Sequence, residues 1–370
     1  MSEPQLLQLV DRTHVRCGRR PWLFFGGCDY LGLAWHPAVR RALSEGVQRG
    51  VLNVAASRLT TGNDPLYGRL ECELAAFFGV ESALLVSTGY ATNLVVAQAL
   101  SGRFTHALLD VRAHVSLADA ALWLGCPVLK FRHRDVKDFE RVLRRCGRRA
   151  RPLVLTDGLF AHDGGVAPLR AYQELLPPGG WLLVDDAHGA GVVGERGQGT
   201  VAASGIRREH VIQCVTLSKA FGSFGGAVLG PASVRRAILE RSHMFAGSTP
   251  LPLPWVRAAL AALNLLRNDA GLHRRLRSNA AWLKGALRES GFVLPDAPGP
   301  IVSLMFRDRR RTLALERALM RNGIHPSLIR YPGAPAGGYF RFVVSSAHTR
   351  AQLQRLARTL APFAKCARAG

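Results

Sequence analysis

Short apolar runs alternate with amphipathic stretches through the first two thirds of the chain. Seven runs rich in valine, leucine and isoleucine have the length of buried strands, and helical spacing of apolar residues marks segments 65–78, 89–100 and 136–145 between them. Such alternation predicts an α/β fold with a mainly parallel, seven-stranded sheet covered by helices on both faces. The expected strands are Ala83–Val86, Ala107–Leu109, Pro127–Phe131, Leu153–Leu155, Trp181–Val184, Val211–Leu217 and Gly226–Leu229.

The pattern changes after Pro252. A long helical tract with little strand signal runs to about residue 291, and shorter strands and a final helix follow it. We therefore predict an N-terminal segment (1–35), a large domain (36–255) and a smaller C-terminal α/β domain (256–370). The expected elements of the smaller domain are helices over Ala258–Leu266, Leu276–Leu287 and Arg350–Ala364 and strands over Ile301–Phe306, His325–Ile329 and Tyr339–Ser345.

Two of the expected strands end in polar side chains that suit one another chemically. The run 181–184 is followed by two carboxylates, beginning with Asp185, and by His188, and the run 211–217 is followed by Lys219 in a turn of small residues. The carboxyl ends of parallel strands share one edge of a sheet, where α/β proteins bind ligands. These residue types are what pyridoxal phosphate needs: a carboxylate for the pyridine nitrogen, a histidine for the phenolic oxygen and a lysine for a Schiff base.

Lys219 is also marked by scarcity. Only five of the 49 basic residues are lysines, and the rest are arginines. Arginine cannot form an imine, whereas lysine can, so a lysine at this strand end favours covalent chemistry. A surface lysine at the end of a strand is the simpler alternative, and the two-part motif disfavours it.

The formal net charge of +23 has two competing explanations. Clustered arginines could bind nucleic acid, but the clusters at 132–151 and 307–311 lack interleaved aromatic residues and a recognisable nucleic-acid motif. The first cluster has the pattern of a solvated helix face with an apolar stripe. We therefore expect no nucleic acid, and favour anionic partners such as coenzyme A or an acidic carrier protein.

Other features exclude further classes of protein. No apolar run has the length of a membrane helix, and the first residues lack the pattern of a signal peptide. The seven cysteines are scattered and include no CxxC pair, which indicates reduced thiols and no zinc site. We expect a cytoplasmic protein without a metal centre or a membrane partner.

An ordered series of motifs runs through the chain: Asp29–Leu33, Ala56–Arg58, Ser87–Asn93, His114 with Ser116, Asp163–Gly164, Asp185–Gly189 and Thr216–Lys219. This series resembles the α-oxoamine synthases, which are pyridoxal-phosphate enzymes of the aspartate-aminotransferase fold (fold type I), with the 8-amino-7-oxononanoate synthase branch nearest. The resemblance covers about residues 23–364 and implies condensation of a small amino acid (alanine, glycine or serine) with an acyl thioester, with loss of carbon dioxide. It also implies a homodimer whose sites lie at the subunit interface.

The resemblance assigns catalytic roles to four residues. Lys219 would carry the covalent link to the cofactor and then act as the base at the substrate Cα. Asp185 would contact the pyridine nitrogen, His188 the phenolic oxygen, and His114 would stack on the ring. Asp186 is expected to serve in hydrogen bonding behind them.

The phosphate site is expected at the start of a helix. Ser87, Thr88, Gly89 and Tyr90 would supply backbone amides, since a helix N-terminus attracts anions and glycine permits close approach. Thr216 and Ser218 of the lysine turn would add hydroxyl donors. The resemblance also implies that Thr249, beside Ser248, belongs to a segment that reaches the phosphate from the partner subunit.

Substrate contacts are implied for three more residues. Arg341 would bind the carboxylate of the amino acid through a bidentate pair. Cys28 replaces the asparagine that is usual in this family, and Ser57 lies near the expected entry of the acyl chain. Glutamate and serine of the family pattern are replaced by Asp157 and Ala161, and Tyr339 stands where an arginine is common, so the departures concern the substrates and leave the lysine chemistry intact.

Three alternatives from other classes stay open. An aminotransferase or lyase of the same fold would need no acyl thioester. A degenerate subunit that only supports an active partner is disfavoured because Asp185, His188 and Lys219 are retained. A nucleic-acid-binding protein would keep its affinity for DNA without Lys219.

Overall fold

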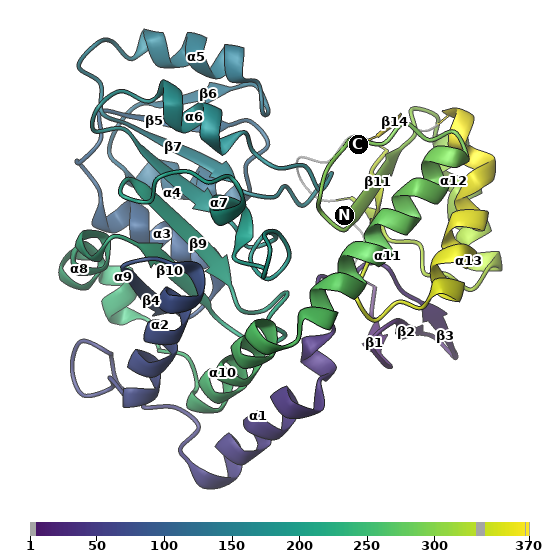
Figure 1. The fold of residues 1–370 in the computed structure, drawn as a ribbon, viewed down its shortest axis with the longest axis horizontal. Helices are drawn as coiled ribbons and strands as arrows, with labels where there is room; N and C mark the ends of the chain where they lie inside the picture. The colour runs from purple at the N-terminus through teal and green to yellow at the C-terminus, as the bar shows by residue number, and fades with distance from the viewer. Residues whose placement is uncertain (1–4, 331–336, 367, 370) are drawn as a thin grey trace. The chain divides into compact units, whose positions relative to one another are not determined.

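The computed structural model describes residues 5–330, 337–366, 368 and 369. The chain forms two compact units (Figure 1), the larger from His36–Phe160 and Val166–Asp269 and the smaller from Met1–Trp35, Ala161–Gly165 and Ala270–Gly370. The sequence predicted a boundary at residue 256 and a separate segment 1–35. The change of pattern at Pro252 instead marks the start of helix α10 (Leu253–Asn268), which packs along helices of the larger unit.

A seven-stranded sheet organises the larger unit, as the sequence predicted. Its strand order is β4-β10-β9-β8-β7-β5-β6, and β10 runs antiparallel to both of its neighbours while the other pairs are parallel. The strands are β4 (Ser82–Val86), β5 (His106–Asp110), β6 (Val128–Phe131), β7 (Pro152–Asp157), β8 (Trp181–Asp185), β9 (Val211–Thr216) and β10 (Gly226–Gly230).

Both faces of this sheet are covered, because side chains of successive strand residues point to opposite faces. In β8, Leu183 packs into the core cluster on one face, whereas Leu182 and Val184 belong to the cluster on the other. Nearly continuous apolar strands therefore fit a sheet that is buried on both sides. The helices of the larger unit are α1 (Pro37–Arg49), α2 (Pro65–Phe78), α3 (Gly89–Ala99), α4 (Val115–Trp123), α5 (Val136–Arg145), α6 (Leu169–Leu175), α7 (Gly199–Ala203), α8 (Ala232–Arg241), α9 (His243–Gly247) and α10.

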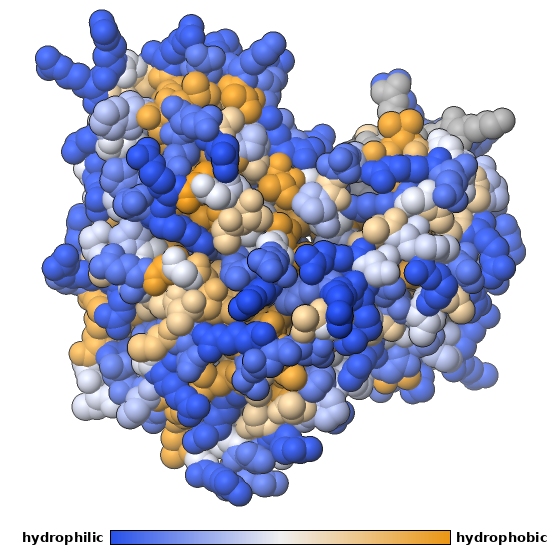
Figure 2. All heavy atoms as spheres, in the orientation of Figure 1, coloured by the Kyte–Doolittle hydropathy of each residue, from blue (hydrophilic) through white to orange (hydrophobic). Residues whose placement is uncertain are grey.

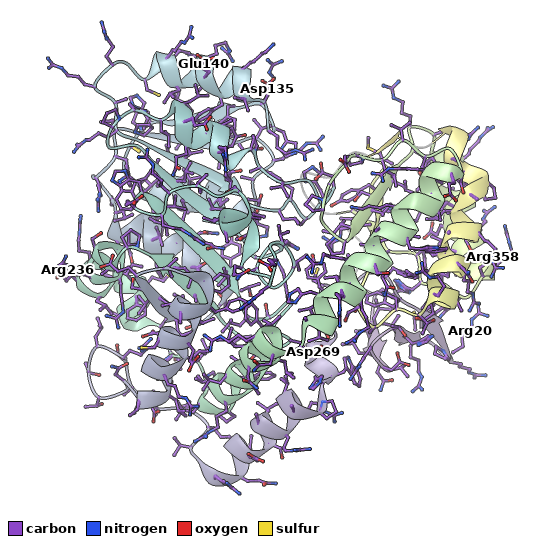
Figure 3. The ribbon with its side chains drawn as sticks, in the orientation of Figure 1. Arg20, Asp135, Glu140, Arg236, Asp269 and Arg358 are labelled. Carbon is purple, nitrogen blue, oxygen red and sulfur yellow. The ribbon has the colours of Figure 1, made fainter. Side chains whose placement is uncertain are left out.

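Helix α5 confirms the solvated helix expected for the densest arginine cluster. Phe139 and Val142 are buried. Arginines on the outer face pair with acidic residues of the same segment, two of which are labelled in Figure 3: Arg132 with Asp135 at 3.1 Å and Arg144 with Glu140 at 2.5 Å. Part of the cluster's positive charge is thus neutralised within the helix.

The smaller unit contains two antiparallel sheets. One has the order β1-β2-β3 and the other β12-β13-β11-β14. A separate core, which includes Phe25, Leu304 and Phe342, fills this unit. Its elements are β1 (Gln8–Leu9), β2 (His14–Cys17), β3 (Arg20–Leu23), η1 (Leu33–Trp35), α11 (Ala270–Glu289), β11 (Ile301–Met305), α12 (Arg309–Arg321), β12 (Leu328–Ile329), β13 (Tyr339–Val343), α13 (Arg350–Leu360), η2 (Ala361–Cys366) and β14 (Arg368–Ala369).

Candidate active site

A pocket of about 220 Å³ lies within the larger unit. Most of its lining comes from the carboxyl ends of β7, β8 and β9 and from the N-termini of α3 and α4, as expected for an α/β sheet. The lining residues are Thr88, Gly89, Tyr90, His114, Ser116, Asp157, Asp185, Ala187, His188, Thr216, Ser218 and Lys219. Nine of these residues were expected in the site from the sequence.

Lys219 and His188 meet in this pocket. The Lys219 Nζ lies 2.7 Å from His188 Nε2, within hydrogen-bond distance. His188 follows β8 and is buried, whereas Lys219 lies in the turn that follows β9 and is half-buried. Because β8 and β9 are adjacent parallel strands, residues that follow them come together although they are 31 positions apart.

Asp185 ends β8 and is held by neutral donors. Its Oδ2 accepts a hydrogen bond from Asn93 Nδ2 at 2.6 Å, and its Oδ1 accepts one from the backbone N–H of Ala187 at 3.1 Å. Its side chain is largely buried, so these bonds fix the direction of a carboxylate that reaches the pocket.

A second carboxyl group lies next to Asp185. Asp157 ends β7 and pairs in register with Asp185 across the two parallel strands. Burial and the neighbouring Asp185 charge raise the pKa of Asp157 well above its ordinary value, which favours the neutral carboxyl group of Asp157. Its Oδ2 accepts the backbone N–H of His114 at 2.9 Å and so holds the start of α4.

His114 caps α4 beside this pair. Its Nδ1 lies 2.7 Å from Ser116 Oγ, and its ring meets the Tyr90 ring edge-to-face at 6.0 Å. Burial of the ring and the nearby Lys219 lower the pKa of His114, against the opposing effect of Asp185, so the neutral imidazole is favoured. The Tyr90 hydroxyl donates to Asp119 of α4, which connects the two helices at the pocket.

The start of α3 approaches the lysine turn closely. Thr88 is its N-cap, and its hydroxyl accepts the N–H of Ala91 at 3.1 Å. A Cβ atom on Gly89 would lie 2.7 Å from Cβ of Thr216, so only glycine allows this approach. Thr216 Oγ1 in turn lies 2.7 Å from Ser218 Oγ, so two hydroxyl groups come together at the turn that approaches the start of α3.

Several expected site residues do not line this pocket. Ser87 Oγ donates to the carbonyl of Thr249 at 2.6 Å, and Ser57 Oγ donates to the carbonyl of Ala246 at 2.7 Å. Cys28 and Arg341 belong to the smaller unit, where Arg341 lies on β13. The roles given to these residues stay predictions.

Sequence reasoning missed three polar residues of the site. Asn93 lies in the motif Ser87–Asn93, one helical turn after Gly89, and the resemblance assigns it no role. The motif of His114 and Ser116 gives no role to Ser116, and Asp157 is marked in the sequence only as a departure from the family pattern. Two positions in the sequence could have indicated these residues: Ser116 lies at the start of a helix, and Asp157 lies at the carboxyl end of a strand, as Asp185 does.

The fold and this pocket define a class of protein, and the chain belongs to the aminotransferase class I and II family, whose model matches residues 21–360. Proteins named 8-amino-7-oxononanoate synthase are similar over nearly the whole chain. The one from Thioalkalivibrio sulfidiphilus is 38% identical over 356 residues, which is 95% of this chain and 89% of that protein. The one from Methylococcus capsulatus is 38% identical over 360 residues, which is 96% of this chain and 93% of that protein.

Solved structures agree with this assignment. Serine palmitoyltransferase from S. paucimobilis, determined with bound PLP–myriocin, superposes with a TM-score of 0.89 at 26% identity and covers 98% of this chain and 93% of its own. The fold is therefore that of the pyridoxal-phosphate-dependent transferases of fold type I, as expected from the sequence. None of the helices in the described part of the chain has both the length and the apolar character that crossing a membrane requires.

Proposed function

We propose that this chain is a pyridoxal-phosphate-dependent C-acyltransferase that condenses L-alanine with a pimeloyl thioester and releases carbon dioxide, as the name of its 8-amino-7-oxononanoate synthase relatives implies. The observation that carries the proposal is the joint placement of Lys219, His188 and Asp185 in one pocket. Similarity to those relatives over nearly the full length supports the same reaction.

The residues of the pocket fit the chemistry of the cofactor. A lysine for covalent attachment lies opposite a carboxylate, and two hydroxyl groups and the start of α3 offer donors to a phosphate. Pyridoxal phosphate, when bound, supplies an electron-withdrawing ring that stabilises negative charge at the substrate Cα.

Each residue in the pocket has a proposed task toward that ring. Lys219 would hold the cofactor and move the Cα proton at its Nζ. His188, whose Nε2 lies 2.7 Å from that Nζ, would orient the amine and contact the phenolic oxygen. Asp185 holds a proton at the pyridine nitrogen, and His114 covers one face of the ring. The phosphate is bound by the amides that follow Thr88 and by the remaining donors: Ser87, Gly89, Tyr90, Thr216, Ser218 and Thr249.

Substrate selection is assigned to three further residues. Arg341 binds the amino acid carboxylate, and Cys28 and Ser57 contact the substrates. Either coenzyme A or an acidic carrier protein delivers the acyl group, since both are anionic and the chain carries a net charge of +23. Hydrophilic side chains predominate on the face drawn in Figure 2, with apolar areas between them.

A homodimer is supported by exposed apolar side chains near the pocket. Helix α4, which begins beside the pocket residue His114, exposes Val115, Leu122 and Trp123, of which Leu122 is 75% exposed. Exposed apolar side chains at both ends of one helix are compatible with an interaction surface. We propose that a second copy covers α4 in a cytoplasmic homodimer, and sedimentation of the purified protein measures this.

The reaction is tested by supplying the cofactor-loaded protein with L-alanine and pimeloyl thioester and measuring release of free thiol. Thiol release that requires both substrates supports the proposal. Conversion of alanine to pyruvate without thioester would instead assign an aminotransferase. Glycine and L-serine in place of L-alanine identify the preferred amino acid.

A further inference from the structure

Asn93 and Ser116 connect two groups of the pocket that the proposed function treats separately, Asp185 and His114. Asn93 lies in α3 and Ser116 in α4, and both are fully buried. Their hydrogen bonds to Asp185 and His114 are the contacts through which they act on the pocket. The proposed role of these residues toward the cofactor ring rests on the proposed function, whereas their effect on His114 does not.

The hydrogens of this cluster can be assigned from its distances. The Asn93 amide has two N–H groups, and Nδ2 lies 2.6 Å from Asp185 Oδ2 and 2.9 Å from Ser116 Oγ. Both amide hydrogens are therefore used, one for each acceptor. The reverse orientation would place the amide oxygen against a carboxylate, which charge repulsion excludes.

This orientation leaves the amide oxygen of Asn93 without a hydrogen bond from the part of the chain that the structure describes, which lowers the stability of the folded state. The Asn93 Oδ1 is buried and has no hydrogen-bond partner within the described residues. An unsatisfied buried acceptor destabilises the folded state. A leucine of similar size would avoid that loss, so the amide is kept for what its two donors do.

Ser116 Oγ accepts a hydrogen bond from Asn93 Nδ2 and donates its hydroxyl hydrogen to His114 Nδ1. Its Oγ lies 2.7 Å from His114 Nδ1 and 3.4 Å from Asp185 Oδ2, so the contact with the ring nitrogen is the shorter of the two hydrogen bonds. The Ser116 backbone N–H also points to His114 Nδ1, at 3.3 Å. A ring nitrogen that receives two donors must present its lone pair, so the proton of the neutral ring is on Nε2.

We propose that Asn93 and Ser116 are positioning residues that fix His114 as the neutral Nε2–H tautomer while they orient the Asp185 carboxylate. Asp185, Lys219 and Asp119 act on the His114 ring by their charge, and Tyr90 and Asp157 are the further titratable groups that face His114. Burial favours the neutral ring against the Asp185 and Asp119 carboxylates. A neutral ring adds no positive charge beside the protonated pyridine nitrogen that Asp185 holds. One hydrogen-bonded cluster would thus set the electrostatics on the edge and on the face of the cofactor ring.

The test uses the full-length, cofactor-free protein labelled with 15N-histidine. Two-bond 1H–15N correlations at pH 8 report which ring nitrogen carries the proton, and a His114→Gln variant identifies the signals of His114. We expect the Nε2–H pattern in the wild-type protein. An Nδ1–H pattern or a doubly protonated ring would overturn the proposal, and this measurement requires no variant of the cluster.

Variants then test whether Asn93 and Ser116 fix the tautomer of His114 or only fill space beside it. Ser116→Ala removes the hydroxyl donor to His114. In Asn93→Ala the Ser116 hydroxyl can turn to Asp185. In both variants a measurable fraction of the His114 rings should therefore carry the proton on Nδ1. Ser116→Thr should restore the wild-type pattern. The matched control is Ser204→Ala, which removes a hydroxyl bonded to the Val201 carbonyl at 2.9 Å and should change nothing at His114.

The outcomes distinguish this inference from the proposed function. An unchanged tautomer in both Ser116→Ala and Asn93→Ala would show that the cluster does not set it. Failure of the wild-type protein to bind pyridoxal phosphate would remove the proposed function but leave the tautomer measurement valid.

Discussion

Two aspartates that are neighbours in the sequence belong to different regions of the larger unit. Asp185 ends β8, reaches the pocket and is bonded to Asn93 and the N–H of Ala187. Asp186 is fully buried away from the pocket lining, and it accepts hydrogen bonds from Thr200 N, Thr200 Oγ1 and Gln213 Nε2 at 2.8, 2.8 and 2.7 Å. Asp185 thus lines the pocket, whereas Asp186 accepts hydrogen bonds in the buried interior.

The difference between them comes from the alternation of side chains along an extended chain. Asp186 holds the segment that starts α7, where a Cβ atom on Gly199 would lie 2.0 Å from Asp186 Oδ2, and Gly199 has a φ of +87°. We therefore expect loss of Asp185 to affect chemistry and loss of Asp186 to affect folding. The predictions below test this separation, from the largest expected effect to the smallest.

Replacement of the pocket lysine gives the largest effect. Lys219→Ala should lower turnover by roughly 1,000-fold or more, because no other group in the pocket can both bind the cofactor covalently and move the Cα proton. The melting temperature should change by less than about 2 °C because Lys219 is only half-buried. Thiol release and thermal unfolding measure the two effects, with the exposed Lys130→Ala of β6 as control. Turnover retained in Lys219→Ala would refute the assignment of the pocket.

Asp185→Asn should lower turnover by roughly 100-fold, as for removal of other preorganised charges in active sites. An amide cannot hold the pyridine nitrogen protonated, so exchange of the alanine Cα proton in deuterated water should slow by a similar factor. Proton exchange at the wild-type rate would remove this role from Asp185.

Asp186→Ala should act on stability instead. It leaves three buried donors of Thr200 and Gln213 without their acceptor, which costs about 3–5 kcal/mol of unfolding free energy. Urea unfolding measures this loss, and turnover per folded molecule at low temperature should stay within about threefold of wild type. A stable but inactive variant would contradict the separation of the two aspartates.

The same variant should change the dependence of stability on pH. Burial raises the pKa of Asp186 from 3.8 to about 6. The unfolded chain therefore loses this proton first, and the contribution of Asp186 to the stability of the wild-type protein falls as pH rises from 3.8 to about 6. Asp186→Ala should lack this part of the decline, and urea unfolding at pH 4.5 and 7.5 compares the two proteins. An identical decline in both proteins would show that Asp186 does not cause it.

Asp157→Asn should have the smallest effect. Its raised pKa favours the neutral carboxyl group, which acts as an acceptor for the His114 N–H, and an asparagine oxygen can replace that acceptor. Affinity for pyridoxal phosphate, measured by fluorescence titration, should change by less than about threefold. A loss as large as that of Asp185→Asn would show that Asp157 carries charge in the working enzyme.

The fold was largely predictable because its strands are buried on both faces. All seven strands of the large sheet and helices α2 and α5 were expected near their observed bounds, since continuous apolar runs and caps leave local signals. The three N-terminal strands were not expected, because β1 to β3 are two to four residues long and partly exposed. The boundary at residue 256 differs from the structure because helix α10 resembles α11 in pattern but packs on the larger unit.

The site was predictable where residues follow strands and where a family resemblance gave them roles. Lys219, His188, Asp185 and His114 do share a pocket. Sequence could not show that Asn93 and Ser116 join Asp185 to His114, because these contacts connect residues 69 and 92 positions apart. Nor could spacing reveal that Asp157 is neutral, which follows from its burial beside Asp185.

The central claim is that this pocket joins an amino acid to an acyl thioester, and coupled product release tests it most directly. Cofactor-loaded protein is mixed with 14C-carboxyl-labelled L-alanine and pimeloyl thioester, and labelled carbon dioxide and free thiol are counted together. We expect equal amounts of the two, only when both substrates are present, and none from Lys219→Ala. Release of thiol without carbon dioxide, or consumption of alanine without thioester, would contradict the claim.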